Sequence, residues 1–427
     1  MLGRWLFLLL VAAAALALLT GTDPVYADGP RVIRNQQEID FPQEVAFTLE
    51  VQAERDIVEV RLNYRFAGSR VWAYSYPTFS PGKRIVAQFS VPTDGANYLS
   101  PGSRIEFSYL IIDSQGNEQA TSPQILEYTD TRYQWEETKV GPLTLFHHDV
   151  SQKRVDSLAL ELAPEIERVA TLLQLNPKEV APIKGYIYNS SRETQDAFPN
   201  QSRTITTEQV FHGFAFPENR VFIGIGLEPG LIVHETTHLL FAQALEPRSR
   251  FIPSWLDEGF ASYMEPGSRP FSGRSMSQYG VSLRAMSTVS GTPRDIYTFY
   301  FKAESVVAYL IQAHGEPDFQ EFMDRLVRGS SFETALLQVY GFNIDELELQ
   351  WSRSSTGRSA QAPSGGIPTE RPNPILYLNS MILGALVLLV AIFATGRFFW
   401  RRLHTEENPE EGLQPWEDPD RDPDNPW

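Results

Sequence analysis

Two histidines four residues apart, His234 and His238, flank Glu235 in a segment that is otherwise apolar. On an α-helix this spacing brings both imidazoles to one face, about one turn apart, where they can share a metal ion. Glu235 would lie beside that ion and could take a proton from a metal-bound water. The pattern predicts hydrolysis by metal-activated water. For these five residues alone, a pair of hydrogen-bonded core histidines is the alternative.

The residues around this motif predict how it is positioned. Pro229 suits the first turn of a helix and Pro247 ends it, and apolar neighbours on nearly every side predict that the helix is buried. Three ionisable groups on a buried helix are costly unless they are paired or metal-bound. A catalytic zinc site also needs a third protein ligand. The chain has no cysteine, so that ligand must be His, Asp or Glu, and a second short helix over residues 253–265 offers one.

The two segments together carry a resemblance. His-Glu-x-x-His at 234–238, followed by Trp-Leu-x-Glu-Gly-x-Ala at 255–261, resembles the signature of the gluzincin metallopeptidases of the peptidase MA clan. The resemblance implies that Glu258 is the third ligand, that one Zn²⁺ is bound per chain and that Glu235 is the general base. Residues 128–149, 300–315 and 332–351 resemble further parts of the peptidase MA-like domain of exported bacterial proteins, so the likeness covers about half the chain.

Two departures from the gluzincin pattern bear on the substrate. Nineteen residues separate His238 from Glu258, one more than is usual in the aminopeptidases of this group, and a loop can absorb one residue. The Gly-x-Met-Glu-Asn segment with which those aminopeptidases hold a free N-terminus has no match, because residues 213–219 lie in the right region but differ. The expected substrate is therefore a peptide or protein cleaved internally.

Three further features are candidates for supporting roles. Tyr300 is the candidate donor to the oxyanion, because the family-like helix is expected to begin there; a core tyrosine is the alternative. Glu265 lies seven residues after Glu258 and could orient a zinc-bound histidine, or it could be a solvated charge. Residues 211–216 are expected at a sheet edge beside the cleft, and the resemblance to the clan implies that an extended substrate pairs with such an edge as an added strand.

The part of the chain before the motif reads as strands. Apolar and polar residues alternate over 44–51, 56–66, 71–76, 85–91 and 105–112, and turn signals containing Gly separate most of these runs. Short strands at this spacing predict a β-sandwich of immunoglobulin or fibronectin type over residues 30–140. A zincin-like metallopeptidase domain is predicted over 141–351, with a helix near 155–175, strands at 183–188 and 211–225, and a helical half. The fold class is thus α+β.

Both ends of the chain predict export and anchoring. Residues 1–27 have the pattern of a signal peptide, with small residues before a cleavage site at Ala27. Residues 375–396 form an apolar run long enough for a transmembrane helix, and the arginines that follow place its C-terminal side in the cytoplasm. A flexible stalk is predicted at 352–374, and a disordered acidic cytoplasmic tail, whose partner is unknown, at 397–427. The predicted location is the cell membrane, with residues 28–374 outside.

The composition of the chain limits the classes of molecule that it is expected to bind. Of the 427 residues 42% are hydrophobic, which is enough for a core, and the net charge of −17 disfavours nucleic acid. Two other functions remain open: a catalytically degenerate peptidase fold used for binding or adhesion, and a plain surface adhesin built around the sandwich. The second leaves the buried histidine helix unexplained.

Overall fold

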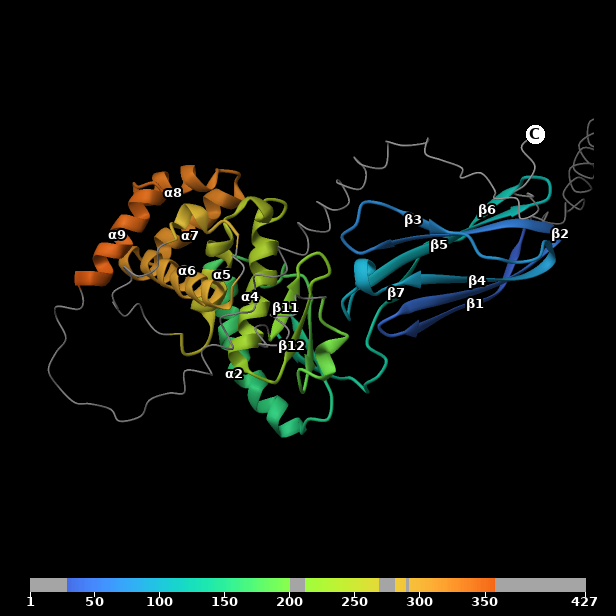
Figure 1. Ribbon diagram of the computed structural model, residues 1–427, viewed down its shortest axis with the longest axis horizontal. Coiled ribbons are helices and arrows are strands. Elements are labelled where there is room, and N and C mark those ends of the chain that lie inside the picture. The colour runs from blue at the N-terminus through green and yellow to red at the C-terminus, as the bar shows by residue number, and fades with distance from the viewer. Residues whose placement is uncertain (1–28, 200–211, 269–280, 289–291, 358–427) are drawn as a thin grey trace, which may run out of the picture. The chain divides into compact units, whose positions relative to one another are not determined.

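The computed structural model describes residues 29–199, 212–268, 281–288 and 292–357. The chain divides into two compact units. The first contains one β-sheet, nearly all of a second and most of helix α2 (Gln152–Leu172). The second contains the helices from Val233 onward, together with the end of α2 and the strand residues Gly213 and Phe214. Figure 1 gives the element labels. The α+β arrangement expected from the sequence, sheets first and helices after them, is confirmed.

The first sheet has seven strands built around one long strand. Its elements are β1 (Arg31–Asp40), β2 (Glu44–Phe66), β3 (Ala73–Ser75), β4 (Gly82–Pro92), β5 (Arg104–Asp113), β6 (Glu118–Ala120) and β7 (Gln124–Glu127). The N-terminal half of β2 pairs with β1 and β4, and its C-terminal half pairs with β3 and β5. The separate strands predicted at 44–51 and 56–66 are thus one strand, interrupted only by a register shift.

Aromatic side chains fill the core of this sheet. Phe47 on β2 lies 5.0 Å from Phe107 on β5, and Phe89 on β4 lies 5.7 Å from Tyr109, measured between ring centroids. No ladder joins β4 to β5 among the described strands, yet their side chains meet. The sheet therefore folds over on itself, and alternate residues of β2, β4 and β5 point inward and are buried.

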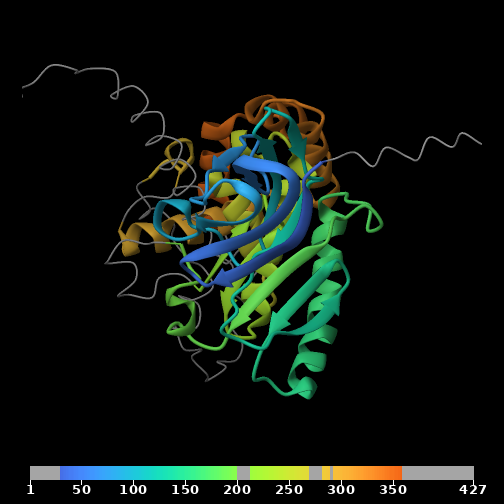
Figure 2. The same cartoon turned by 90° about the vertical axis from the view of Figure 1, so that its right-hand side faces the viewer.

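The second sheet has five strands in the order β11-β12-β10-β9-β8. These are β8 (Glu136–Val140), β9 (Leu143–His147), β10 (Ile183–Tyr188), β11 (Gly213–Phe216) and β12 (Val221–Ile225). β9 and β10 are parallel and are connected by α2 (Gln152–Leu172), which runs alongside the sheet in Figure 2. β8 pairs with β9, so the second sheet already begins at Glu136, before the domain boundary expected near residue 140. Among the described strands, β11 lies at one edge of this sheet, where the sequence predicted an edge.

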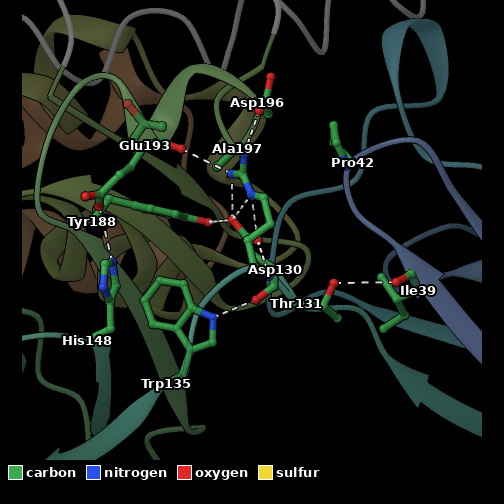
Figure 3. A network of polar contacts seen from close by, with 12 residues as sticks. Ile39, Pro42, Asp130, Thr131, Trp135, His148, Tyr188, Glu193, Asp196 and Ala197 are labelled. Carbon is green, nitrogen blue, oxygen red and sulfur yellow. Dashed lines mark hydrogen bonds and ion pairs between the residues drawn. The ribbon is translucent and has the colours of Figure 1, made fainter.

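A buried carboxylate fixes the segment that links the two sheets. Asp130 has no exposed surface and accepts hydrogen bonds from Arg132 at 2.7 Å and from Tyr188 of β10 at 3.0 Å. Its carbonyl oxygen accepts a third from Trp135 at 2.8 Å, and Arg132 also reaches Asp196 (Figure 3). The linking segment is therefore held against β10 by a network in which every charge has a partner.

The second unit is helical. Its main elements are α4 (Pro229–Leu245), which begins in the first unit, α5 (Ser254–Met264), α6 (Pro293–His314), α7 (Glu316–Val327), α8 (Phe332–Tyr340) and α9 (Ile344–Gly357). The expectation that a helix begins at Tyr300 was wrong. α6 begins at Pro293, because Thr292 caps it by accepting a hydrogen bond from the Asp295 amide and proline suits the first helical position.

Polar contacts tie α9 to α6. The buried ammonium of Lys302 on α6 bonds to Glu348 on α9 and lies 5.3 Å from the ring of Trp351. The indole of Trp351 donates a hydrogen bond to the Ser305 hydroxyl at 3.0 Å. The last described helix is therefore joined to α6 by both polar and aromatic contacts.

The predicted signal peptide, most of the stalk, the transmembrane helix and the tail lie outside the described residues. Within the described part of the chain, no helix combines the length and the apolar character needed to cross a bilayer.

Candidate metal centre

Helix α4 carries both histidines in a buried position. His234 and Glu235 have no exposed surface and His238 is 6% exposed. Apolar neighbours before and after the motif, such as Ile232, Val233 and Leu239, are fully buried as well. The predicted buried helix is confirmed, and its start at Pro229 agrees with the sequence pattern. Burial of this kind makes the charged form of an ionisable group costly unless the group is paired, bound or neutral.

Helix α5 brings Glu258 to the two histidines. The helix can approach α6 closely because Gly259 has no side chain: a Cβ there would lie 2.4 Å from the carbonyl oxygen of Ala303. Trp255, Leu256 and Phe260 are fully buried on the same helix. The glycine that follows the carboxylate in the sequence motif is therefore required by helix packing, and this packing positions Glu258.

Three ligand atoms form a small triangle. Nε2 of His234 and Nε2 of His238 lie 3.1 Å apart. Oε2 of Glu258 lies 3.3 Å from Nε2 of His238 and 3.7 Å from Nε2 of His234. Around a tetrahedral zinc with bonds of about 2.0–2.2 Å, ligand atoms are about 3.3–3.6 Å apart. The donor set and its spacing fit a zinc ion. Among the described residues, no other three His, Asp or Glu side chains bring their ligand atoms within 4.8 Å of one another.

The second nitrogen of each imidazole is held by a carboxylate. Nδ1 of His234 lies 2.8 Å from Oε1 of Glu265, and Nδ1 of His238 lies 2.8 Å from Oδ1 of Asp257. A neutral imidazole that donates its Nδ1 proton to a carboxylate presents the lone pair of Nε2. Both Nε2 atoms belong to the ligand triangle, so the carboxylates orient the histidines in the way a metal requires. The contact that the hypothesis about Glu265 requires, between its carboxylate and a histidine of the site, is confirmed.

Burial and neighbouring charges shift the pKa values of the site. Burial opposes a charged His234, but hydrogen bonds to Glu258 and Glu265 outweigh it and raise its pKa to about 9. Burial likewise opposes a charged His238, and the carboxylates of Asp257 and Glu258 raise its pKa well above the usual value. For Glu258, burial is overcome by the histidine charges, and the pKa falls to about 2. Without a metal, the site is thus a set of ion pairs.

Glu235 differs from the other groups. Both of its carboxylate oxygens are buried, and neither has a hydrogen-bond partner among the described residues. Burial raises its pKa to about 7, although the nearby His234 and His238 act in the opposite direction. A carboxylate that can gain or lose a proton near neutral pH has the property required of a general base.

Two residues of helix α6 lie at the border of the site, Tyr300, which the sequence singled out, and Glu304, which it did not. Tyr300 is fully buried in the interior of the helix, not at its start. Glu304 lies one turn further along the same face, and burial together with the charge of Glu265 raises its pKa to about 8. The charge of His234 also acts on Glu304, so this face of α6 borders the site.

The geometry can be compared with known families. A family model described as the peptidase MA superfamily matches residues 166–357. This match contains all three ligands and Glu235. The chain carries a peptidase MA domain.

The other comparisons identify no further family for this chain. Comparison with curated proteins gives no match. Among solved structures, a carbohydrate-binding module family 56 β-1,3-glucan-binding domain is similar at 14% identity, covering 22% of this chain and 96% of that chain with a TM-score of 0.15. A bromine derivative of BhCBM56 is similar at 12% identity, covering 21% and 97%, also with a TM-score of 0.15.

Proposed function

We propose that the peptidase MA domain is a zinc-dependent peptidase of the gluzincin type that hydrolyses internal peptide bonds. The observation that carries the proposal is the ligand triangle of His234, His238 and Glu258 beside the carboxylate of Glu235, which has no hydrogen-bond partner in the described part of the chain. His234, His238 and Glu258 would hold the ion. When bound, zinc supplies a Lewis acid and lowers the pKa of water to about 7.

The protein groups would then move the protons. Glu235 would accept a proton from the attacking water and return it to the leaving amine. Asp257 and Glu265 would keep both imidazoles in the correct tautomer. Tyr300 remains our proposed donor to the oxyanion, because it shares a helix face with Glu304 at the border of the site.

The proposal is tested first by metal content. Purified full chain, dialysed without chelator, should contain about one zinc, and Glu258→Ala should lose it. Elemental mass spectrometry gives the ratio. A chain that holds no zinc, even after reloading, would end the peptidase proposal and favour a binding protein on a peptidase fold.

Catalysis is tested separately. Glu235→Gln should retain zinc and lose hydrolysis of an unfolded protein substrate by about 10²–10⁴-fold. Tyr300→Phe should retain zinc and reduce kcat by about 10²–10³-fold if Tyr300 stabilises the oxyanion. If zinc is bound but the wild-type chain and Glu235→Gln are equally inactive on every substrate tested, the binding or adhesion alternative is favoured.

We also propose that the domain acts outside the cytoplasm and is anchored by one C-terminal helix. The support is the apolar pattern of residues 1–27 and 375–396 and the arginines that follow the second run. Protease added to intact cells should remove an epitope placed after residue 28 and leave one placed at residue 427.

A further inference from the structure

Three aromatic side chains are exposed on a short stretch of the first sheet. Trp72, Tyr74 and Tyr76 are 41%, 65% and 54% exposed, and the rings of Tyr74 and Tyr76 lie 5.7 Å apart. They occupy alternate positions in and beside β3, so they share one face of the strand. The residues between them, Ala73 and Ser75, are half-buried. Soluble proteins seldom gather large aromatic groups on the surface unless that surface binds something.

The neighbouring strands add polar groups to the same face. Directly opposite residues in antiparallel strands point to the same side. Asn63 on β2 is opposite Tyr74 on one side and Ser108 of β5 on the other. Arg65 is opposite Glu106, and its Nε donates a hydrogen bond to that carboxylate at 2.7 Å. The face therefore consists of an aromatic edge followed by rows of hydrogen-bonding side chains.

Arg65 connects the aromatic and polar parts. Its guanidinium carbon lies 4.7 Å from the ring centroid of Trp72. A cavity of about 380 Å³ adjoins it, lined by Arg65, Arg104, Glu106, Ile125 and the loop at 66–69. Ile125 is 66% exposed. An indole ring, a fixed ion pair and a hollow thus occur together.

We propose that this aromatic face, formed by Trp72, Tyr74 and Tyr76 with Arg65 and Glu106, binds a neutral glycan chain. The C–H faces of sugar rings carry a slight positive charge and stack on the negative faces of aromatic rings. Sugar hydroxyls both donate and accept hydrogen bonds, and the Arg65–Glu106 pair offers donors and an acceptor together. Side chains about 6.6–6.8 Å apart along a strand can engage successive sugar units.

The charges on this face favour a neutral ligand over other partners. Arg65 is compensated by Glu106, so a polyanion would find no concentration of free positive charge at the pair. A purely apolar partner would have to remove the ion pair from water, which is costly. A sugar chain instead replaces the water on these groups with hydroxyls. The site lies entirely in the first sheet, so it does not depend on the proposed peptidase activity.

Affinity electrophoresis tests the proposal with the purified full chain. Native gels would contain laminarin, xylan or galactomannan, three neutral soluble polysaccharides. Retarded migration is expected in at least one gel. Trp72→Ala and, separately, Tyr74→Ala should weaken that binding at least tenfold, whereas Phe251→Ala, which removes an exposed aromatic ring of the helical half, should leave it unchanged.

Circular dichroism and thermal melting of each variant would show that folding is retained, and Tyr74→Ala is the variant to use if Trp72→Ala does not fold. The proposal is overturned if no gel retards the chain, or if both folded variants bind as tightly as the wild-type chain. It is also overturned if the aromatic face mediates binding to phospholipid vesicles or self-association, in a Trp72-dependent manner, without glycan binding.

Discussion

Asp257 contacts one ring nitrogen of His238, and Glu258, the next residue in the chain, faces the other ring nitrogen. Oδ1 of Asp257 lies 2.8 Å from Nδ1, and Oε2 of Glu258 lies 3.3 Å from Nε2 of the same ring. Consecutive residues of α5 therefore fix the imidazole from both sides. A shift of α5 would disturb the ligand and its support together.

This arrangement predicts a measurable effect on metal affinity. Asp257→Ala and Glu265→Ala should each weaken zinc binding by about 10–100-fold, because each removes the carboxylate that orients one histidine. Competition with a fluorescent chelator gives the affinity. Glu246→Gln, an exposed carboxylate change on the segment after α4, is the control. Unchanged affinity in both alanine variants would mean that these carboxylates only contribute to folding.

Gly259 should not tolerate even a methyl group. In Gly259→Ala the new Cβ would overlap the carbonyl group of Ala303, so α5 and α6 must separate. Overpacking of this kind costs about 1–3 kcal/mol of unfolding free energy. Urea unfolding of the metal-free chain measures it. Gly82→Ala, where the nearest atom to the new Cβ is 3.8 Å away, should change much less, and equal effects at both positions would refute the packing argument.

Asp113 should make the first sheet sensitive to acid. Asp113 accepts a hydrogen bond from the side chain of Asn117, and this bond lowers its pKa by more than burial raises it. The backbone amides of Asn117 and Gln115 also donate to Asp113, and its pKa falls from 3.8 to about 2. A depressed pKa stabilises the fold above pH 3.8, and this contribution is lost as the pH falls toward 2.

The corresponding variant is Asp113→Asn. Its melting temperature should be below that of the wild-type chain at pH 7. The difference should shrink at pH 2.5, because the carboxyl is then protonated in the unfolded wild-type chain and must lose its proton on folding. Differential scanning fluorimetry at both pH values is sufficient. A difference that stays constant with pH would show that the charge of Asp113 does not matter.

Asp130 should be far more important for stability than an exposed ion pair. Asp130→Ala leaves Arg132, Tyr188 and the linking segment without their buried acceptor, and loss of one partner of a buried pair costs about 3–5 kcal/mol. Because Arg132 is partly exposed, the lower end of this range is expected. Arg284→Ala removes two exposed ion pairs and should cost at most about 1 kcal/mol. Similar losses in the two variants would count against the network.

The candidate site could be predicted from the sequence largely because its spacing is local. The spacing of four residues from His234 to His238 defines a helix face, and Glu258 follows from a motif on the next helix. Asp257 was missed. Its contact with His238 depends on how α5 packs against α4, and no spacing within one helix shows this.

The fold was predicted less completely, for physical reasons. The segment between 52 and 56 has neither Gly nor Pro, so β2 continues through it with a register shift where a break was expected. The sequence does contain the start of α6, since Thr292, Pro293 and Asp295 form a capping pattern. This capping pattern, and not the family-like segment from Tyr300 onward, marks the start of the helix.

The bonds between α9 and α6 have a mechanical consequence. A force applied to the chain after Gly357 acts first on α9. The hydrogen bonds from Trp351 to Ser305 and from Lys302 to Glu348 transmit this force to α6. α6 is also the helix whose Ala303 backbone lies against Gly259, the residue next to Glu258. Tension at the C-terminal end of the domain would therefore be carried to the helix that packs beside the metal ligand, and the ligand triangle would lie on the path of the applied force.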